Sequence, residues 1–205
     1  YIAGKGYVLR SPSYAVVVGG VNMDIGGRSN APLVDADSNP GVVRMSLGGV
    51  GRNIAHNMAL LGCDVRFLTA LGSDLYAEKI AASCAELGID ISHALTLPGE
   101  RTSTYLFLSG PDGDMACAVN DMAIYDRFTP AYLRSKKALL DNAQLIIIDA
   151  NIPQESIEWL CSSVQVPIFA DPVSTAKCGK LKNVLGRLHT LKPNRLEAER
   201  LTGVA

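Results

Sequence analysis

Short apolar runs alternate with helical patterns along most of this chain, and no other feature constrains the fold as strongly. The runs are residues 14–21, 64–71, 144–150, 166–171 and 189–193, and the helical patterns are residues 50–62, 74–87, 154–163 and a further one that opens at Asn194. Successive apolar residues in a run indicate a strand buried on both faces, as in a parallel sheet covered by helices. The sequence therefore predicts an α/β fold, with a mostly parallel sheet flanked by helices, in one domain that begins at residue 14.

Two segments interrupt this alternation. Residues 25–47 are rich in Gly, Pro, Asn and Asp and contain one short strand pattern, "VVRMSL", whereas residues 102–121 alternate like a hairpin around the turn signal "GPDGD". Two β excursions from an α/β core predict a small β lid over a binding site. Within the second excursion, residues 105–108 are interpreted as sheet core and not as a platform on which a base stacks.

Composition excludes several classes of function. The 205 residues carry a formal net charge of −1, so the chain presents no overall basic field to nucleic acid or to an anionic membrane. No apolar run approaches the length of a membrane span. The five cysteines are scattered without a C-x-x-C pair, which predicts reduced thiols in a cytoplasmic protein, and the three histidines lack metal-ligand spacing.

The stretch "SLGGVGRNIAHNMALLG", residues 46–62, places three glycines directly before a helical pattern. It is not a Walker-type phosphate loop, and Ile54 fills the position of the third glycine of a dinucleotide-binding fingerprint, which argues against a Rossmann dehydrogenase. Glycines let a ligand approach the backbone, and a helix start offers unpaired N–H groups. Gly49 and Asn53 are therefore candidate binding residues, with a tight loop-to-helix turn as the alternative.

Polar residues also follow the first apolar run, in "GGVNMDIGG". Asn22 and Asp24 are two residues apart, so both side chains are expected on one side of the chain. A carboxylate and an amide held together can grip sugar hydroxyls, because a carboxylate accepts two hydrogen bonds. Ordinary turn chemistry is the alternative.

The segment "TLKPNRLEAERLTG" has two interpretations. Asn194 is a credible N-cap and Glu197 occupies the capping-box position three residues later. The functional alternative is a hydrated Mg²⁺ beside phosphates, because Mg²⁺ keeps several waters and needs only one or two protein oxygens. Asn151 and Asp171, the latter with Lys177 nearby, follow strand ends, where open α/β sheets bind ligands, although either could be an ordinary loop residue.

These pieces occur together in one family. From about residue 14 to the last residue, the chain resembles the ribokinase-like (PfkB-type) carbohydrate kinases through "VNMD", "DSNPG", "GGVGRNIAHNMALLG", "VNDM", "DPVSTAK" and "HTLKPNRLEAE". Within that family it is most similar to the pseudouridine-kinase subgroup, through "SNPG", "NDM" and "DPVS".

The resemblance implies transfer of the ATP γ-phosphoryl group to the primary hydroxyl of a sugar or nucleoside, pseudouridine first among them. It implies ATP and Mg²⁺ as cofactors, with a monovalent cation as an option, and a homodimer formed through the lid. The implied substrate residues are Asn22, Asp24, Gly49, Asn53 and Asn151, together with Thr102, Thr104, Asn120 and Asp121 of the lid. The implied phosphate and metal residues are Asn194, Glu197, Asp171 and Lys177, with Glu197 holding Mg²⁺ through water.

One expected motif does not occur in these 205 residues. The family base is an aspartate in a G-A-G-D turn, and that sequence is not found here. The resemblance implies that the C-terminal third of the domain lies beyond residue 205 and that this chain alone has no kinase activity. Another sugar or nucleoside kinase, or a ligand-sensing regulator built on a kinase fold, is the alternative.

We expect the first 13 residues to form a leader ahead of the kinase-like part. Their start, "YIAGKGYVLR", resembles the last β-wing of a winged helix-turn-helix domain, which some relatives carry, and a disordered leader is the alternative. DNA is an expected partner only if such a domain precedes the chain.

Overall fold

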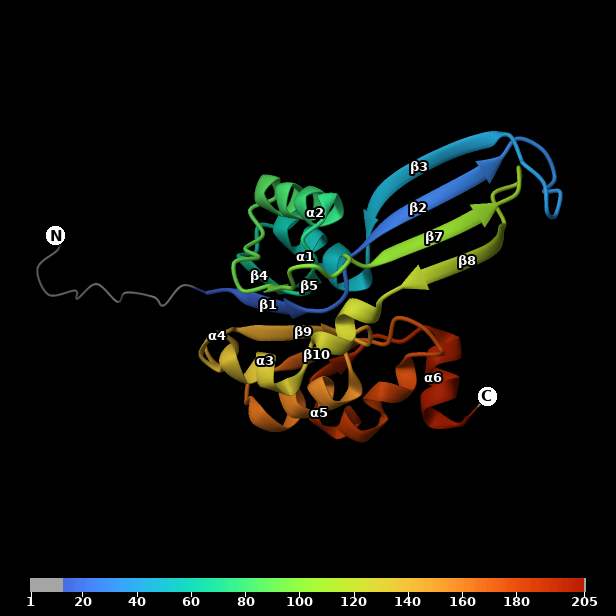
Figure 1. Cartoon of the computed structure of the whole chain (residues 1–205). Coiled ribbons are helices and arrows are strands. Elements are labelled where there is room, and N and C mark those ends of the chain that lie inside the picture. The colour runs from blue at the N-terminus through green and yellow to red at the C-terminus, as the bar shows by residue number, and fades with distance from the viewer. Residues whose placement is uncertain (1–12, 205) are drawn as a thin grey trace, which may run out of the picture.

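The computed structural model of the chain describes residues 13–204, and its centre is a five-stranded parallel sheet (Figure 1). The strand order is β11-β10-β9-β1-β4. The bounds are β1 Ala15–Val18, β4 Val65–Leu68, β9 Leu145–Asp149, β10 Ile168–Asp171 and β11 Thr190–Leu191. All four neighbouring pairs are parallel, which confirms the predicted sheet.

Helices cover both faces of this sheet, as the apolar runs predict (Figure 1). In β1, Val16 and Val18 point into one buried cluster and Val17 into the other. The Val17 side is covered by α1 (Val50–Leu60) and α2 (Leu75–Glu86). The opposite side is covered by η1 (Ala123–Arg127), α3 (Pro130–Ser135), α4 (Lys137–Asp141), α5 (Gln154–Ser163) and η2 (Cys178–Arg187), and α6 (Arg195–Thr202) follows β11.

The ends of the helices follow local sequence signals. The side chain of Asp74 caps α2 by accepting a 2.9 Å hydrogen bond from the Ala77 N–H, and Gly88 takes a left-handed φ of +70° just after the helix. Gly62 does the same after α1, with φ +82°. These glycines end the helices where the pattern predicts, because a residue without Cβ enters this conformation without strain.

The two excursions form one four-stranded sheet, the lid, which projects from the core (Figure 1). Its order is β3-β2-β7-β8, with β2 Asn22–Ser29, β3 Gly41–Gly48, β7 Thr104–Ser109 and β8 Met115–Asp121. Each excursion is an antiparallel pair, and β2 joins β7 in parallel. The hairpin predicted over residues 102–121 is confirmed, with its turn closed between Gly110 and Asp114.

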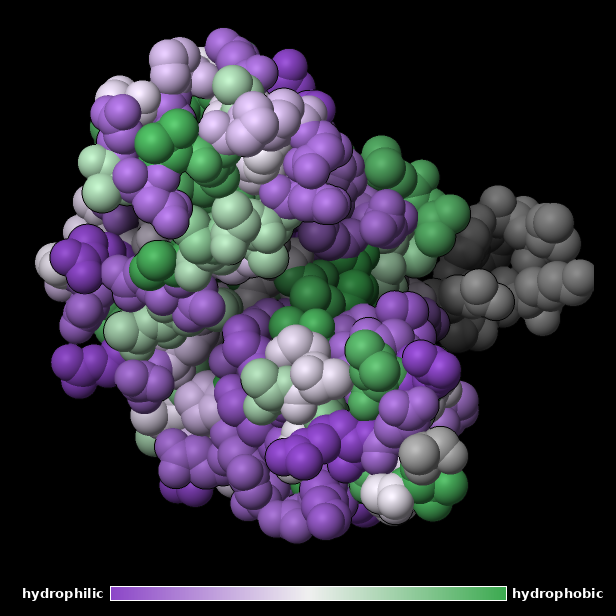
Figure 2. Space-filling view, turned by 90° about the vertical axis from the view of Figure 1, so that its right-hand side faces the viewer, coloured by the Kyte–Doolittle hydropathy of each residue, from purple (hydrophilic) through white to green (hydrophobic). Residues whose placement is uncertain are grey.

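The register gives the lid two different faces. The Asp24 face carries Asp24, Gly26, Arg28, Val42, Arg44, Ser46, Tyr105, Phe107 and Asn120. The apolar face carries Ile25, Val43, Met45, Leu106, Leu108, Cys117 and Val119. Val43 is 71% exposed and Val119 68% exposed, so the apolar face is uncovered in the single chain. Figure 2, which looks from the side on which the lid projects, shows apolar patches among the polar surface.

Three expectations were wrong in detail. The strand predicted over residues 14–21 ends at Val18, because the chain turns through two glycines and starts the lid at Asn22. The strand predicted over 64–71 divides at Thr69 into β4 and β5 (Ala70–Leu71), and β5 pairs with β6 (Leu95–Thr96). Residues 105–108 are not sheet core, since they belong to the lid, where Leu106 is 43% and Leu108 41% exposed.

The β-wing was predicted on residues 1–12, which lie outside the described residues. Within residues 13–204, no helix is long and apolar enough to cross a membrane.

Candidate functional site

The candidate site lies where β1 and β9 end, side by side in the sheet. From β1 the chain continues to β4 on one side, whereas β9 continues to β10 on the other, so the strand order reverses between them. Open α/β sheets bind ligands in the crevice outside the carboxyl ends of their strands at such a point. The polar residues predicted after these two strands are therefore brought to one place.

Four glycines form the floor of the site: Gly19 and Gly20 after β1, and Gly49 and Gly51 at the start of α1. A Cβ on Gly51 would lie 2.8 Å from the Gly19 Cα, and a Cβ on Gly49 would lie 2.5 Å from the Gly20 carbonyl oxygen. Gly49 also has φ +97°, which L residues rarely adopt. The glycine stretch is needed for close backbone packing between α1 and the end of β1, and this packing brings the helix start to the strand ends.

Asn22 and Asp24 open the lid directly beside this floor. The Asn22 side-chain amide donates a hydrogen bond to Asp24 Oδ1, so the predicted pairing on one side of the chain is present. Asp24 lies against Gly48, where a Cβ would overlap its carboxylate. Burial raises the pKa of Asp24 above its ordinary value, although the hydrogen bond from Asn22 works in the opposite direction. The carboxylate is thus presented from a half-buried strand and not from a loose turn.

Asn53 lies in the first turn of α1 and is exposed. Its backbone N–H donates to the Gly49 carbonyl over 2.9 Å, and its side-chain oxygen accepts a long 3.5 Å contact from Arg52. The side chain is therefore free to meet a ligand above the glycine floor.

Asp149, which the sequence analysis did not single out, connects the whole floor. It is fully buried at the end of β9 and accepts hydrogen bonds from the Gly20 N–H (2.9 Å), the Gly51 N–H (2.7 Å), the Asn151 N–H (2.8 Å) and the Asn151 side-chain amide (2.9 Å). Burial raises the pKa of Asp149, while these donors lower it. The available signal was an aspartate that ends the apolar run "LIIID".

Asn151 and Lys177 are in direct contact. Lys177 Nζ donates a 2.7 Å hydrogen bond to Asn151 Oδ1, and Lys180 Nζ donates to the carbonyls of Ala150 and Ile152 at 3.0 Å each. Burial lowers the pKa of both lysines. Two ammonium groups therefore lie at the carboxyl end of β9, and Lys180 is a second residue that the sequence analysis missed.

The predicted lid residues divide between different environments. Asn120 lies on the Asp24 face, because it pairs with Tyr105, which pairs with Asp24. Thr104 and Asp121 pair with each other and lie on the opposite face. Asp121 forms an ion pair with Arg101.

Thr102 is buried away from the other lid residues. Its hydroxyl donates to Asp74 at 2.7 Å and accepts from the Gly72 N–H at 3.0 Å. Thr102 therefore supports the N-terminus of α2 through Asp74, the N-cap residue of that helix.

Asn194 and Glu197 form a complete capping box at α6. The Asn194 side chain accepts from the Glu197 N–H (2.9 Å), and Glu197 Oε2 accepts from the Asn194 N–H (2.8 Å). Asp171 ends β10, where it accepts from the Val173 N–H (2.8 Å) and meets Lys192 at 3.4 Å. Within residues 13–204 there is no cluster of three or more metal-ligating side chains. A single carboxylate with Oε1 outside the capping box fits only a water-mediated Mg²⁺ contact.

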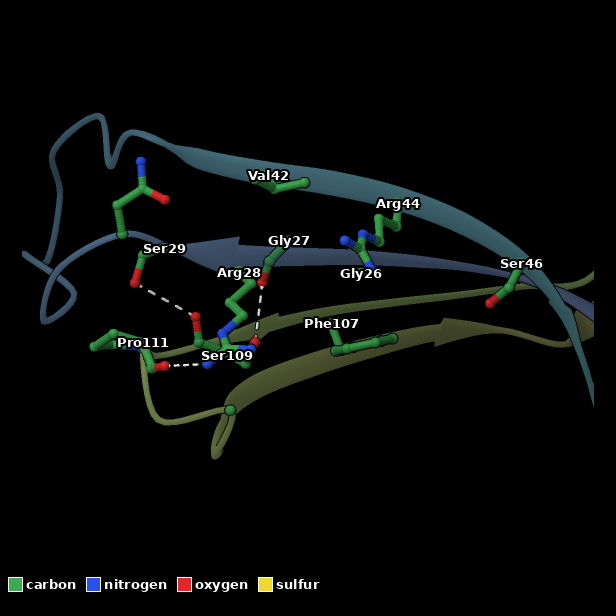
Figure 3. Close-up of a pocket in the computed structure, with 12 residues that line it drawn as sticks. Gly26, Gly27, Arg28, Ser29, Val42, Arg44, Ser46, Phe107, Ser109 and Pro111 are labelled. Atoms are coloured by element: carbon green, nitrogen blue, oxygen red, sulfur yellow. Dashed lines mark hydrogen bonds between the residues drawn. The ribbon is translucent and has the colours of Figure 1, made fainter.

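A cavity of about 690 Å³ lies on the Asp24 face of the lid (Figure 3). The Phe107 ring lies over Gly26, where a Cβ would come within 2.5 Å of it, and Arg44 extends over the same strand (Figure 3). Arg44 forms no ion pair within the described part of the chain. The cavity therefore offers an aromatic surface from β7 and a free guanidinium from β3, the two strands that flank the Asp24 strand β2.

Comparisons with known proteins show what the chain as a whole is similar to. The sequence profile of the pfkB family carbohydrate kinases matches residues 12–205. Pseudouridine kinase of Escherichia coli (strain K12) is 43% identical over 198 residues, 96% of this chain and 63% of that protein. The solved structure of a carbohydrate kinase from Agrobacterium tumefaciens is 31% identical with a TM-score of 0.86, over 93% of this chain and 64% of that one.

A third comparison shows likeness of fold. Arabidopsis thaliana ribokinase, solved in complex with ribose and ATP, has a TM-score of 0.78 at 21% identity, over 94% of this chain and 64% of that one. The chain thus spans 63–64% of the length of these three proteins.

Proposed function

The chain belongs to the pfkB family of carbohydrate kinases, and from this premise we propose that the protein it forms transfers the ATP γ-phosphoryl group to the primary hydroxyl of pseudouridine. The observation that carries the proposal is the Asn22–Asp24 pair beside the glycine floor at the strand-order reversal. The 43% identity to a pseudouridine kinase supports the choice of substrate.

The site suits a sugar with neighbouring hydroxyls. Asp24 can accept two hydrogen bonds when ionised, and Asn22 fixes its orientation. In this proposal the exposed side chain of Asn53 contacts the sugar from the first turn of α1. The N–H groups expected to be unpaired there are already used, because Gly51 donates to Asp149 and Arg52 to the Gly20 carbonyl. Phosphoryl transfer depends on such positioning and on charge neutralisation more than on covalent help from the protein.

The lid cavity favours a nucleoside over a free sugar. Asn151, an amide where sugar kinases of the family often carry an acid, leaves this preference open and fits a nucleoside no worse than a free sugar. The lid cavity extends from Ser46, the cross-strand partner of Asp24, along Gly26 and Phe107, which leaves space for a second ring attached to the sugar. In this proposal Phe107 and Arg44 face that ring.

The phosphate side of the reaction is assigned to the neighbouring strand ends. Lys177, beside Asn151, would neutralise phosphate charge, while Asp171, Asn194 and Glu197 would lie near the metal-bound phosphates. Glu197 would hold Mg²⁺ through water with the oxygen outside the capping box. ATP as donor is supported by the fold likeness to the ribokinase solved with ribose and ATP.

We further propose that the protein is a homodimer joined through the apolar face of the lid. Val43, Met45, Leu106 and Val119 form a contiguous exposed apolar surface there. A surface of this kind marks an interaction site, and a second copy supplies a matching apolar face in a symmetric dimer.

Transfer of labelled phosphate from ATP tests the proposal. The purified whole protein should phosphorylate pseudouridine faster than uridine or D-ribose, whereas the 205-residue chain, without a G-A-G-D turn, should bind without transferring. Phosphorylation of D-ribose alone would favour the sugar-kinase alternative. Nucleoside binding without any transfer by the whole protein would favour the ligand-sensing alternative.

A further inference from the structure

We propose that Asp149 is a positioning residue, which holds the glycine floor in place and sets the direction of the Asn151 amide in the substrate pocket. The inference rests on the proposed function for its substrate, and it adds a residue that acts through its neighbours and touches no reacting atom.

The first argument is the number and origin of the hydrogen bonds. Oδ2 of Asp149 accepts from Gly20, Gly51 and the Asn151 side chain, and Oδ1 accepts from the Asn151 N–H. These donors come from the end of β1, the start of α1 and the end of β9. One side chain therefore fixes three segments that meet only at the candidate site. All four groups are N–H donors, so both oxygens of Asp149 serve as acceptors here.

The second argument is the amide orientation of Asn151. Its Nδ2 faces Asp149 at 2.9 Å and its Oδ1 faces the Lys177 ammonium at 2.7 Å. An ionised carboxylate only accepts and an ammonium only donates, so a flipped amide would meet the wrong partner at both ends. One N–H and one lone pair of Asn151 remain in defined directions for a substrate.

The third argument concerns the two floor glycines after β1, which lie against Asp149 and Asn151 as well as against α1. A Cβ on Gly19 would lie 2.7 Å from Asp149 Oδ2, and a Cβ on Gly20 would lie 2.6 Å from Asn151 Nδ2. The turn after β1 is therefore shaped around the Asp149–Asn151 pair. This close approach is possible only for residues without a side chain.

Calorimetric titration with pseudouridine tests the positioning role in the purified protein. Asp149→Asn keeps an acceptor for Gly20, Gly51 and the Asn151 amide but loses the charge, and we expect it to weaken binding about tenfold. Asn151→Ala should weaken binding too, and the double variant should bind within about twofold of Asn151→Ala, because Asp149 acts through Asn151. Asp90→Asn is the matched control, since Asp90 pairs with Arg66 at the amino end of β4.

A role confined to stability gives different results. In that case Asp149→Asn lowers the thermal midpoint, as Asp90→Asn does, but binds like the wild type at temperatures where both are folded. That outcome overturns the proposal, as does simple addition of the two single effects in the double variant.

Backbone and side-chain NMR supplies a second readout, which needs no ligand. The Gly20 and Gly51 amide resonances and the Asn151 side-chain amide should shift together in Asp149→Asn and stay unchanged in Asp90→Asn.

If the wild type binds neither pseudouridine nor D-ribose, the proposed function fails, and the NMR result alone decides the positioning role. If these resonances shift independently of one another, or do not shift, the result overturns the positioning role of Asp149. If Asp149→Asn does not fold, hydrogen exchange in the wild type decides, because fast exchange at Gly20 and Gly51 contradicts the proposal.

Discussion

Among the glycines of residues 13–204, Gly49 alone combines a left-handed φ with no room for a Cβ. Its φ of +97° and the 2.5 Å approach of a Cβ to the Gly20 oxygen combine strain with a backbone clash. We expect Gly49→Ala to lower the free energy of unfolding by about 3 kcal/mol, measured by urea denaturation. Gly62→Ala is the matched control, because Gly62 has φ +82° but open space around it, and it should cost about 1 kcal/mol. Equal effects of the two substitutions would contradict the close packing of the floor.

Asp24 should make substrate binding sensitive to acid. Burial raises its pKa, and only the ionised carboxylate accepts hydrogen bonds from two hydroxyls. As the pH falls, Asp24 therefore takes up its proton at a higher pH than an exposed aspartate, and affinity is lost there first. Titrations of pseudouridine at decreasing pH should show this loss, whereas Asp24→Asn should bind weakly at every pH. Wild-type affinity that stays constant down to about pH 4, where ordinary aspartates protonate, would be inconsistent with this role.

At the scale of elements, α6 allows capping and metal binding to be separated. Asn194→Ala removes the cap and should destabilise the protein by about 1 kcal/mol in thermal or urea unfolding. Glu197→Gln keeps an oxygen that can accept from the Asn194 N–H, so stability should change by less than about 0.5 kcal/mol. The same variant of the whole protein should need more Mg²⁺ for activity. An unchanged Mg²⁺ requirement would leave capping as the only role of Glu197.

The lid makes a prediction about assembly. Charges on its apolar face, in the double variant Val43→Glu and Val119→Glu, should convert a dimer into a monomer, measured by light scattering after size exclusion. Both residues are exposed in the single chain, so folding should be little affected. Leu61→Glu is the control, because Leu61 is 82% exposed at the end of α1 and away from the lid. A monomeric wild type, or a dimer that survives the double variant, would rule out this interface.

For the whole molecule, the core was predictable because its signals are local. Buried strands such as β9 and helices such as α5 are marked by apolar runs, and the cap at Asp74 and the glycines after α1 and α2 mark helix ends. The lid hairpin was also predictable from its turn. The path from Val18 into β2 was not, because leaving one sheet for another depends on long-range pairing of β2 with β7.

The candidate site was predictable in part for the same reason. Asn22, Asp24, Gly49 and Asn151 follow the ends of apolar or strand patterns, so the sequence marked them as candidates, and the structure brings them to neighbouring strand ends. Asp149 was missed because its importance comes from donors 98 and 129 residues away in the chain. The sides taken by Thr104 and Asn120 depend on strand register, which one sequence does not specify at the lid.

The central claim is that the Asn22–Asp24 pair and the glycine floor bind a nucleoside, and calorimetric titration of pseudouridine into the wild type and Asp24→Ala tests it most directly. Unfolding of both proteins should be followed in parallel. The account predicts saturable binding by the wild type and a loss of at least about 100-fold in Asp24→Ala, with a nearly unchanged thermal midpoint. A variant that is less stable but binds pseudouridine like the wild type would show that Asn22 and Asp24 only shape a turn.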